Sequence, residues 1–140
     1  MNTEQFLNQT FRLHEEIDKI DRNIEALRDL ATSDTATLSD TPRAPSPSNS
    51  RMADIVVEIA DLEQEKKTLE ERLLKARRDI ITAARQLNSN ENAVIIERYV
   101  HLLSWESVCD TLGYSRRQVQ RLHKAATGKI MVPSKGKSQK

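Results

Sequence analysis

Two long heptad patterns of apolar residues constrain the fold of this 140-residue chain more than any other feature. The series in residues 1–31 is Phe6, Thr10, Leu13, Ile17, Ile20, Ile24, Leu27 and Ala31. The series in residues 51–87 is Met52, Ile55, Ile59, Leu62, Lys66, Leu69, Leu73, Ala76, Ile80, Ala83 and Leu87. Alternating steps of four and three are typical of helices that pack in a coiled coil. We therefore predict an all-α fold that begins with a long helical hairpin or coiled-coil arm.

Residues 32–50, between the two patterns, have a different composition. They are rich in Ser and Thr and contain Pro42, Pro45 and Pro47. Proline lacks the backbone donor that a helix needs, and it pushes the preceding residue toward an extended backbone. We therefore predict that this segment is a flexible linker between two coiled-coil helices.

Folding the two helices back across this linker predicts which residues meet. Lys66, a polar residue in the second series, would lie roughly opposite Ile17, within reach of Asp18 or Glu16. The second helix is the longer one, so its apolar residues from Ile80 onward need a further partner, either the C-terminal domain or a second chain. The arm is also expected to join two copies of the chain in a homodimer.

Residues 104–126 have the pattern of a helix-turn-helix. Ser104 and Ser115 are expected to cap two helices, and Gln118 has capping-box spacing from Ser115. Gly113 stands where a helix end favours a left-handed residue. The apolar faces expected to be buried are Val108, Cys109 and Leu112 on the first helix and Val119, Leu122 and Ala126 on the second.

A third helix is predicted before this motif. Asn88 and Glu91 have capping-box spacing and open a helix that extends to about Leu103. Its buried face is expected to comprise Val94, Ile95, Tyr99 and Leu102. With the two motif helices it forms a trihelical helix-turn-helix domain over residues 88–127. Residues 128–140, which contain four lysines, are predicted to be a basic disordered tail.

The second motif helix directs basic and amide side chains away from its apolar stripe. They are Arg116, Arg117, Gln120, Arg121 and Lys124. Such a helix enters the major groove of DNA, where Arg pairs with guanine and Gln with adenine. The distribution of charge supports DNA binding by this part of the chain. Residues 88–140 contain 9 Lys+Arg and 4 Asp+Glu, whereas residues 1–87 contain 13 Lys+Arg and 17 Asp+Glu. We therefore predict that the C-terminal part binds double-stranded DNA.

The C-terminal part also resembles a known group of proteins. The matching residues are Glu97-Arg98-Tyr99, Ser104-Trp105-Glu106 and Leu112-Gly113-Tyr114-Ser115-Arg116-Arg117-Gln118-Val119. They resemble small proteins of Gram-positive phages and prophages whose C-terminal part is similar to the fourth conserved region of sigma factors. Ser107 departs from the acidic residue usual in that group.

This resemblance covers residues 88–126 and implies phage transcriptional regulation, often of late genes. It places four side chains toward the bases and two serines near phosphates. These are Arg116, Arg117, Gln120 and Arg121, and Ser104 and Ser115. The location expected for such a protein is the cytoplasm of a bacterial host cell.

Other chemistry is not indicated. Cys109 is the only cysteine and is expected to be a buried structural thiol. The three histidines are scattered and the three glycines form no phosphate-binding loop, so we predict neither an enzyme nor a cofactor or metal site. No apolar stretch approaches 18 residues, so no membrane partner is expected.

Three functions remain open on the sequence. The first is a transcription regulator that self-associates through its arm. The second is a phage DNA-packaging recognition subunit similar to a small terminase, for which a large ring would be expected. The third is a coiled-coil adaptor that contacts RNA polymerase and protects no specific DNA sequence.

Overall fold

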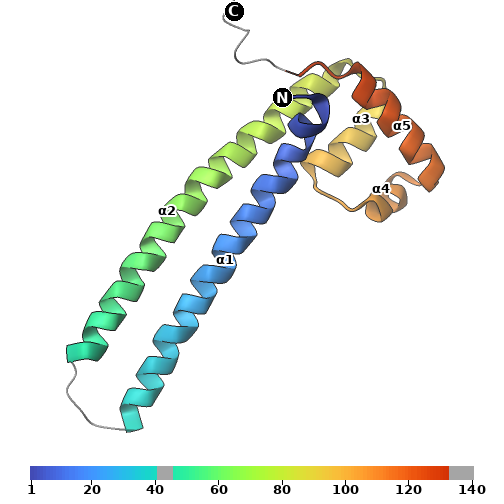
Figure 1. The fold of residues 1–140 in the computed structure, drawn as a ribbon. Coiled ribbons are helices and arrows are strands. Elements are labelled where there is room, and N and C mark those ends of the chain that lie inside the picture. The colour runs from blue at the N-terminus through green and yellow to red at the C-terminus, as the bar shows by residue number, and fades with distance from the viewer. Residues whose placement is uncertain (41–45, 133–140) are drawn as a thin grey trace, which may run out of the picture. The chain divides into compact units, whose positions relative to one another are not determined.

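The computed structural model describes residues 1–40 and 46–132, and the side chains of residues 1–32 and 51–132. Its helical segments are α1 (Thr3–Asp40), α2 (Ser46–Ala83), η1 (Ala84–Gln86), α3 (Ser89–Ile95), η2 (Ile96–Val100), α4 (Trp105–Leu112) and α5 (Arg116–Lys129) (Figure 1). These described residues contain no strand, which confirms the all-α class.

The chain divides into two compact units, and both long helices contribute to each of them. Glu15–Glu71 form the hairpin unit. Met1–His14 and Arg72–Lys140 form the helix-turn-helix unit. This division differs from the predicted one, because the first 14 residues belong with the C-terminal part of the chain.

Within the hairpin unit, α1 and α2 lie side by side and antiparallel. Lys66 Nζ lies 2.7 Å from Asp21 Oδ1, and Arg28 Nη2 lies 3.1 Å from Glu63 Oε2. The heptad residues buried in this unit are Ile17, Ile20, Ile24, Ile55 and Leu69. The hairpin therefore forms within one chain, which buries its own apolar series.

The predicted partner of Lys66 is wrong by about one helical turn. Lys66 pairs with Asp21, and this hydrogen bond raises the pKa of the lysine. The shift follows from the helix ends: α1 continues to Asp40 and α2 begins at Ser46. The predicted helix end at Ala31 therefore placed the turn of the hairpin too early in the chain.

Helix thus replaces much of the predicted linker, residues 32–50. The Ser, Thr, Ala and Asp residues before position 40 lower helix propensity only moderately, and the first strong breaker is Pro42. Pro47 falls in the first turn of α2, where a missing N–H removes no helix hydrogen bond. The five residues between the two helices lie outside the described part of the chain.

Two clusters of buried side chains form the core of the helix-turn-helix unit. The larger cluster comprises Phe6, Leu7, Ile80, Ala83, Ala84, Leu87, Ile95, Tyr99, Ala126 and Ile130. The smaller cluster comprises Val94, Val108 and Val119, with half-buried residues around them. The apolar end of α2 therefore packs on the C-terminal domain, which is one of the two partners predicted for it.

The last helix extends beyond the predicted end of the domain. α5 continues to Lys129, and Ile130 is buried in the larger cluster, so residues 128–132 are not a disordered tail.

Lys129 Nζ donates to both carboxylate oxygens of Glu91 at 2.9 Å. Glu91 also forms the predicted capping box with Asn88. The Lys129 hydrogen bond holds the pKa of Glu91 below its usual value. Residues 133–140 lie outside the described residues.

The helix predicted to reach Leu103 ends earlier. Its α-helical turns, α3, give way to the π-helical turn η2, and His101 N–H donates to Ile96 O at 3.0 Å. Leu102 then adopts a left-handed backbone with φ 59°. As a result Leu102 is only half-buried, whereas Tyr99 is buried as predicted.

Gly113 and Gly128 provide a matched test of the turn. Gly113 has φ +71°, and a Cβ would meet no atom within 4 Å at either glycine. We expect Gly113→Ala to destabilise the protein by about 1–2 kcal/mol, because an L residue disfavours the left-handed region. Gly128→Ala, inside α5, should stabilise it by about 0.5–1 kcal/mol. Urea unfolding of both variants measures this, and equal stabilities would contradict the left-handed turn.

Candidate nucleic-acid interface

Local hydrogen bonds fix the two motif helices. Ser104 Oγ accepts from the Ser107 backbone N–H at 3.1 Å, and the two hydroxyls also lie 3.1 Å apart. Ser115 Oγ accepts from the Gln118 N–H at 3.1 Å, which is one half of the predicted capping box. Gly113 ends α4 in the left-handed conformation. Both predicted N-caps and the predicted turn are therefore confirmed.

The apolar faces of α4 and α5 pack together, but they are buried only in part. Val108, Val119 and Ala126 are buried as predicted, whereas Leu112 and Leu122 are half-buried against the smaller cluster. Cys109 is only half-buried, so the prediction of a buried thiol is wrong. Its side chain lines an open hollow between α4 and α5, which accounts for the remaining exposure. Tyr114 Oη donates to Asn90 Oδ1 at 2.9 Å and so joins the turn to the start of α3.

The side chains predicted to face DNA are all exposed, but they occupy two adjacent rows on α5. The outer row consists of Arg117, Arg121 and Lys124, spaced by four and three residues. Within the described part of the chain, none of these three cations forms an ion pair. Arg116 and Gln120 lie in the neighbouring row, nearer α4. The outer row is thus an uncompensated positive strip on the solvent side of α5.

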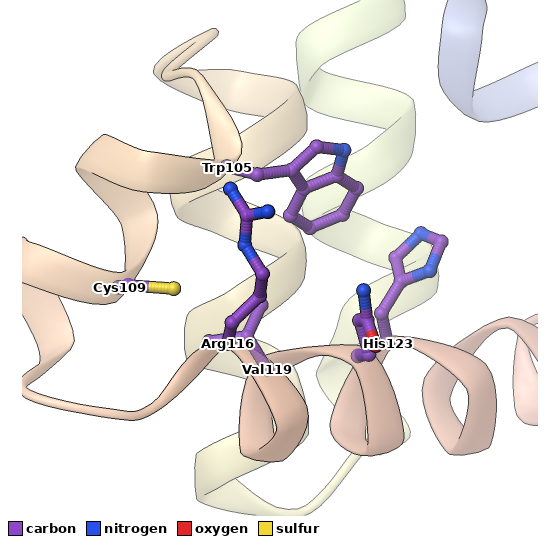
Figure 2. Close-up of a pocket in the computed structure, with 6 residues that line it drawn as sticks. Trp105, Cys109, Arg116, Val119 and His123 are labelled. Atoms are coloured by element: carbon purple, nitrogen blue, oxygen red, sulfur yellow. The ribbon is translucent and has the colours of Figure 1, made fainter.

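A hollow of about 250 Å³ lies between α4 and α5. Figure 2 shows the side chains around it. The residues that line it are Trp105, Cys109, Arg116, Val119, Gln120 and His123. Arg116 extends from the first turn of α5 toward Trp105, so it does not share the direction of the outer row (Figure 2). The structure therefore separates Arg116 from Arg117, which the sequence had grouped together.

An aromatic cluster supports one wall of the hollow. Arg98 Cζ lies 4.4 Å from the ring centroid of Phe11 and 4.3 Å from that of Trp105. Arg98 Nη1 also donates to Leu103 O at 2.9 Å. The ring of Trp105 meets His123 edge-on at 4.8 Å. Sequence reasoning missed this cluster, and its only signal was Phe11, an aromatic residue just outside the heptad series.

A hydrogen bond to Tyr99 fixes His123 inside the unit. Its Nε2 lies 2.8 Å from Tyr99 Oη. Burial, and secondly the charge of Arg98, lower the pKa of His123. Burial raises the pKa of Tyr99, and the charge of Arg98 opposes this rise. The hydrogen bond between Tyr99 Oη and His123 Nε2 therefore ties α5 to η2 inside the unit.

Protonation of His123 gives a pH dependence. The imidazole has a lower pKa in the folded chain than in the unfolded chain, so below about pH 6.5 the unfolded chain binds the additional proton. The free energy of unfolding should be highest above this pH and should fall as the pH drops toward the pKa of His123 in the folded chain. Urea unfolding at several pH values measures the slope. His123→Gln should flatten it. An unchanged slope in His123→Gln would contradict this assignment.

Comparisons with protein families, with curated proteins and with solved structures give no match for this chain. No helix in the described residues is both long and apolar enough to cross a membrane. In the same residues, no group of three or more His, Cys, Asp or Glu side chains is arranged to hold a metal ion. The geometry around α5 is therefore the basis for a functional proposal.

Proposed function

We propose that this chain is a sequence-specific DNA-binding protein of the transcription-regulator class, which places α5 in the major groove. The observation that supports this most directly is the outer row. Three exposed cations lie in register on the second helix of a capped helix-turn-helix, and no carboxylate in the described residues compensates them. A positive strip of this kind matches the phosphate-lined groove of a duplex.

The dimensions of α5 suit this role. The outer row spans about 10 Å along the helix, at about 1.5 Å per residue, and the major groove is about 12 Å wide. Arg117 lies in the first turn, where recognition helices contact base edges. Lys124 lies almost two turns further along, where the helix approaches the backbone. Ser104 and Ser115 cap helix N-termini, which favour nearby phosphates.

The hairpin unit is proposed to contact protein partners. Its heptad residues are buried or half-buried within one chain, so a second copy or RNA polymerase would meet its outer surface. Leu30, Val56 and Val57 are exposed apolar side chains in this unit. The homodimer, the polymerase contact and the role in phage transcription stay predictions.

Selection of bound duplexes from a random library tests the proposed function. We expect the wild-type protein to enrich a short common sequence, and a variant with alanine at all three outer-row positions to enrich none. The control removes three exposed cations from the hairpin unit, Lys19, Arg22 and Lys67, and should enrich the same sequence as the wild type. A wild-type pool without a common sequence would overturn the proposal and favour an adaptor with weak DNA affinity.

A further inference from the structure

We propose that the hollow between α4 and α5 seats one phosphate of the DNA backbone, bound by Arg116. Arg116 would then position the duplex, and Arg117 of the outer row would contact the bases. This inference rests on the proposed function and adds to it a binding site for a phosphodiester group. This role differs from the one implied by the resemblance to phage regulatory proteins, which places Arg116 among the residues that contact bases.

The direction of Arg116 is the first argument. Its side chain runs across the hollow toward Trp105, the first residue of α4 (Figure 2). In a helix-turn-helix the first motif helix crosses the DNA backbone while the second lies in the groove. A side chain turned toward the start of α4 therefore faces backbone, whereas Arg117, one residue later, is rotated by about 100° around the helix axis.

The chemistry of the lining is the second argument. Arg116 and Gln120 line the hollow with hydrogen-bond donors, and His123 lines it beside them. The hydrogen bond from His123 Nε2 to Tyr99 Oη keeps this ring in its place in the lining. Arg116 is exposed, and within the described residues it forms no ion pair. A donor-rich recess with an unpaired guanidinium suits an oxyanion with several acceptor oxygens.

The apolar part of the lining suits the sugar beside such a phosphate. The ring of Trp105 forms one wall, and Val119 and Cys109 also line the recess. Arg98 and His123 hold this ring from within the unit, so the wall is fixed before any ligand binds. A flat apolar wall beside a cation matches the deoxyribose and phosphate of a single nucleotide.

The surrounding charges limit the site to one phosphate. On α4, the residues that directly follow the two lining positions are Glu106 and Asp110, and both are exposed carboxylates. The positive potential is therefore confined to the α5 side of the hollow. A longer run of backbone along α4 would meet these two negative charges.

The test measures binding of a random-sequence duplex over a salt series by fluorescence anisotropy. We expect Arg116→Ala to reduce the salt slope by about one unit and the affinity roughly tenfold at 0.1 M salt. Arg116→Lys should restore most of the slope. Lys67→Ala, which removes one exposed cation from the hairpin unit, is the matched control and should leave the slope unchanged.

A second measurement places the phosphate. Trp105 is the only tryptophan, so its emission reports directly on the hollow. Duplex binding should change this emission in the wild type and in Arg117→Ala, and much less in Arg116→Ala at saturating DNA. If Arg116→Ala binds the duplex with the wild-type salt slope and the wild-type change in Trp105 emission, the phosphate site is overturned and the proposed function is not. Failure of the wild type to bind any duplex overturns the proposed function instead.

Discussion

Replacing Leu7 with alanine should destabilise the helix-turn-helix unit by about 2–5 kcal/mol, a large part of the stability of a small domain. Leu7 is 1% exposed and belongs to the cluster that contains Ile95 and Ala126. Truncation therefore leaves a cavity in the core against which α5 packs. Urea unfolding followed by Trp105 fluorescence measures the effect in this unit directly.

Leu74→Ala is the matched control for this experiment. Leu74 also lies in the helix-turn-helix unit but is 54% exposed, so its truncation should change stability by no more than about 0.5 kcal/mol. A domain that folded from residue 88 onward alone would show the same Trp105 transition in Leu7→Ala and in the wild type. That outcome would contradict the role of the first turns of α1 in the core.

The second large effect is expected at Arg117. Arg117→Ala should weaken binding to the selected DNA sequence by about 1–3 kcal/mol and relax the preference at one base pair. Arg117 is exposed in the first turn of α5, where a bidentate contact to a base is lost on truncation. Lys124→Ala should instead weaken selected and random duplexes alike and lower the salt slope by about one unit.

Binding of both variants to the selected and a random duplex across a salt series separates these roles. The two variants remove one positive charge each from the same row, so each serves as the charge control of the other. An equal loss on both duplexes for Arg117→Ala would mean that α5 contacts no base through this residue. The adaptor function would then account better for the outer row.

Features set by nearby residues were predictable from the sequence. Ser104, Ser115 and Asn88 each cap a helix by accepting a hydrogen bond three residues along the chain. The left-handed turn at Gly113 follows from the absence of a Cβ. The heptad spacing likewise predicted the buried face of each long helix, since helical periodicity places these side chains on one side.

Features set by distant contacts were not predictable. The pairing of Lys66 with Asp21 depends on where the chain folds back, and the low helix propensity around residue 40 hid the true helix end. The docking of Phe6 and Leu7 in the C-terminal core was not predicted, because Phe6 fits the coiled-coil pattern and Leu7, which lies outside it, gives no sign of its distant partner. The direction of Arg116 depends on the space beside Trp105, which a sequence does not display.

The core of the helix-turn-helix unit joins the two ends of the described chain, with consequences for folding during synthesis. Leu7 shares a cluster with Ala126 and Ile130, residues more than a hundred positions later. Contacts of such high sequence separation form slowly, and here they must wait until α5 has left the ribosome. Until then the side chains of Leu7 and Ile80 remain partly exposed to solvent. A product that stops before α5 would expose this surface to chaperones and proteases, so incomplete copies would be removed.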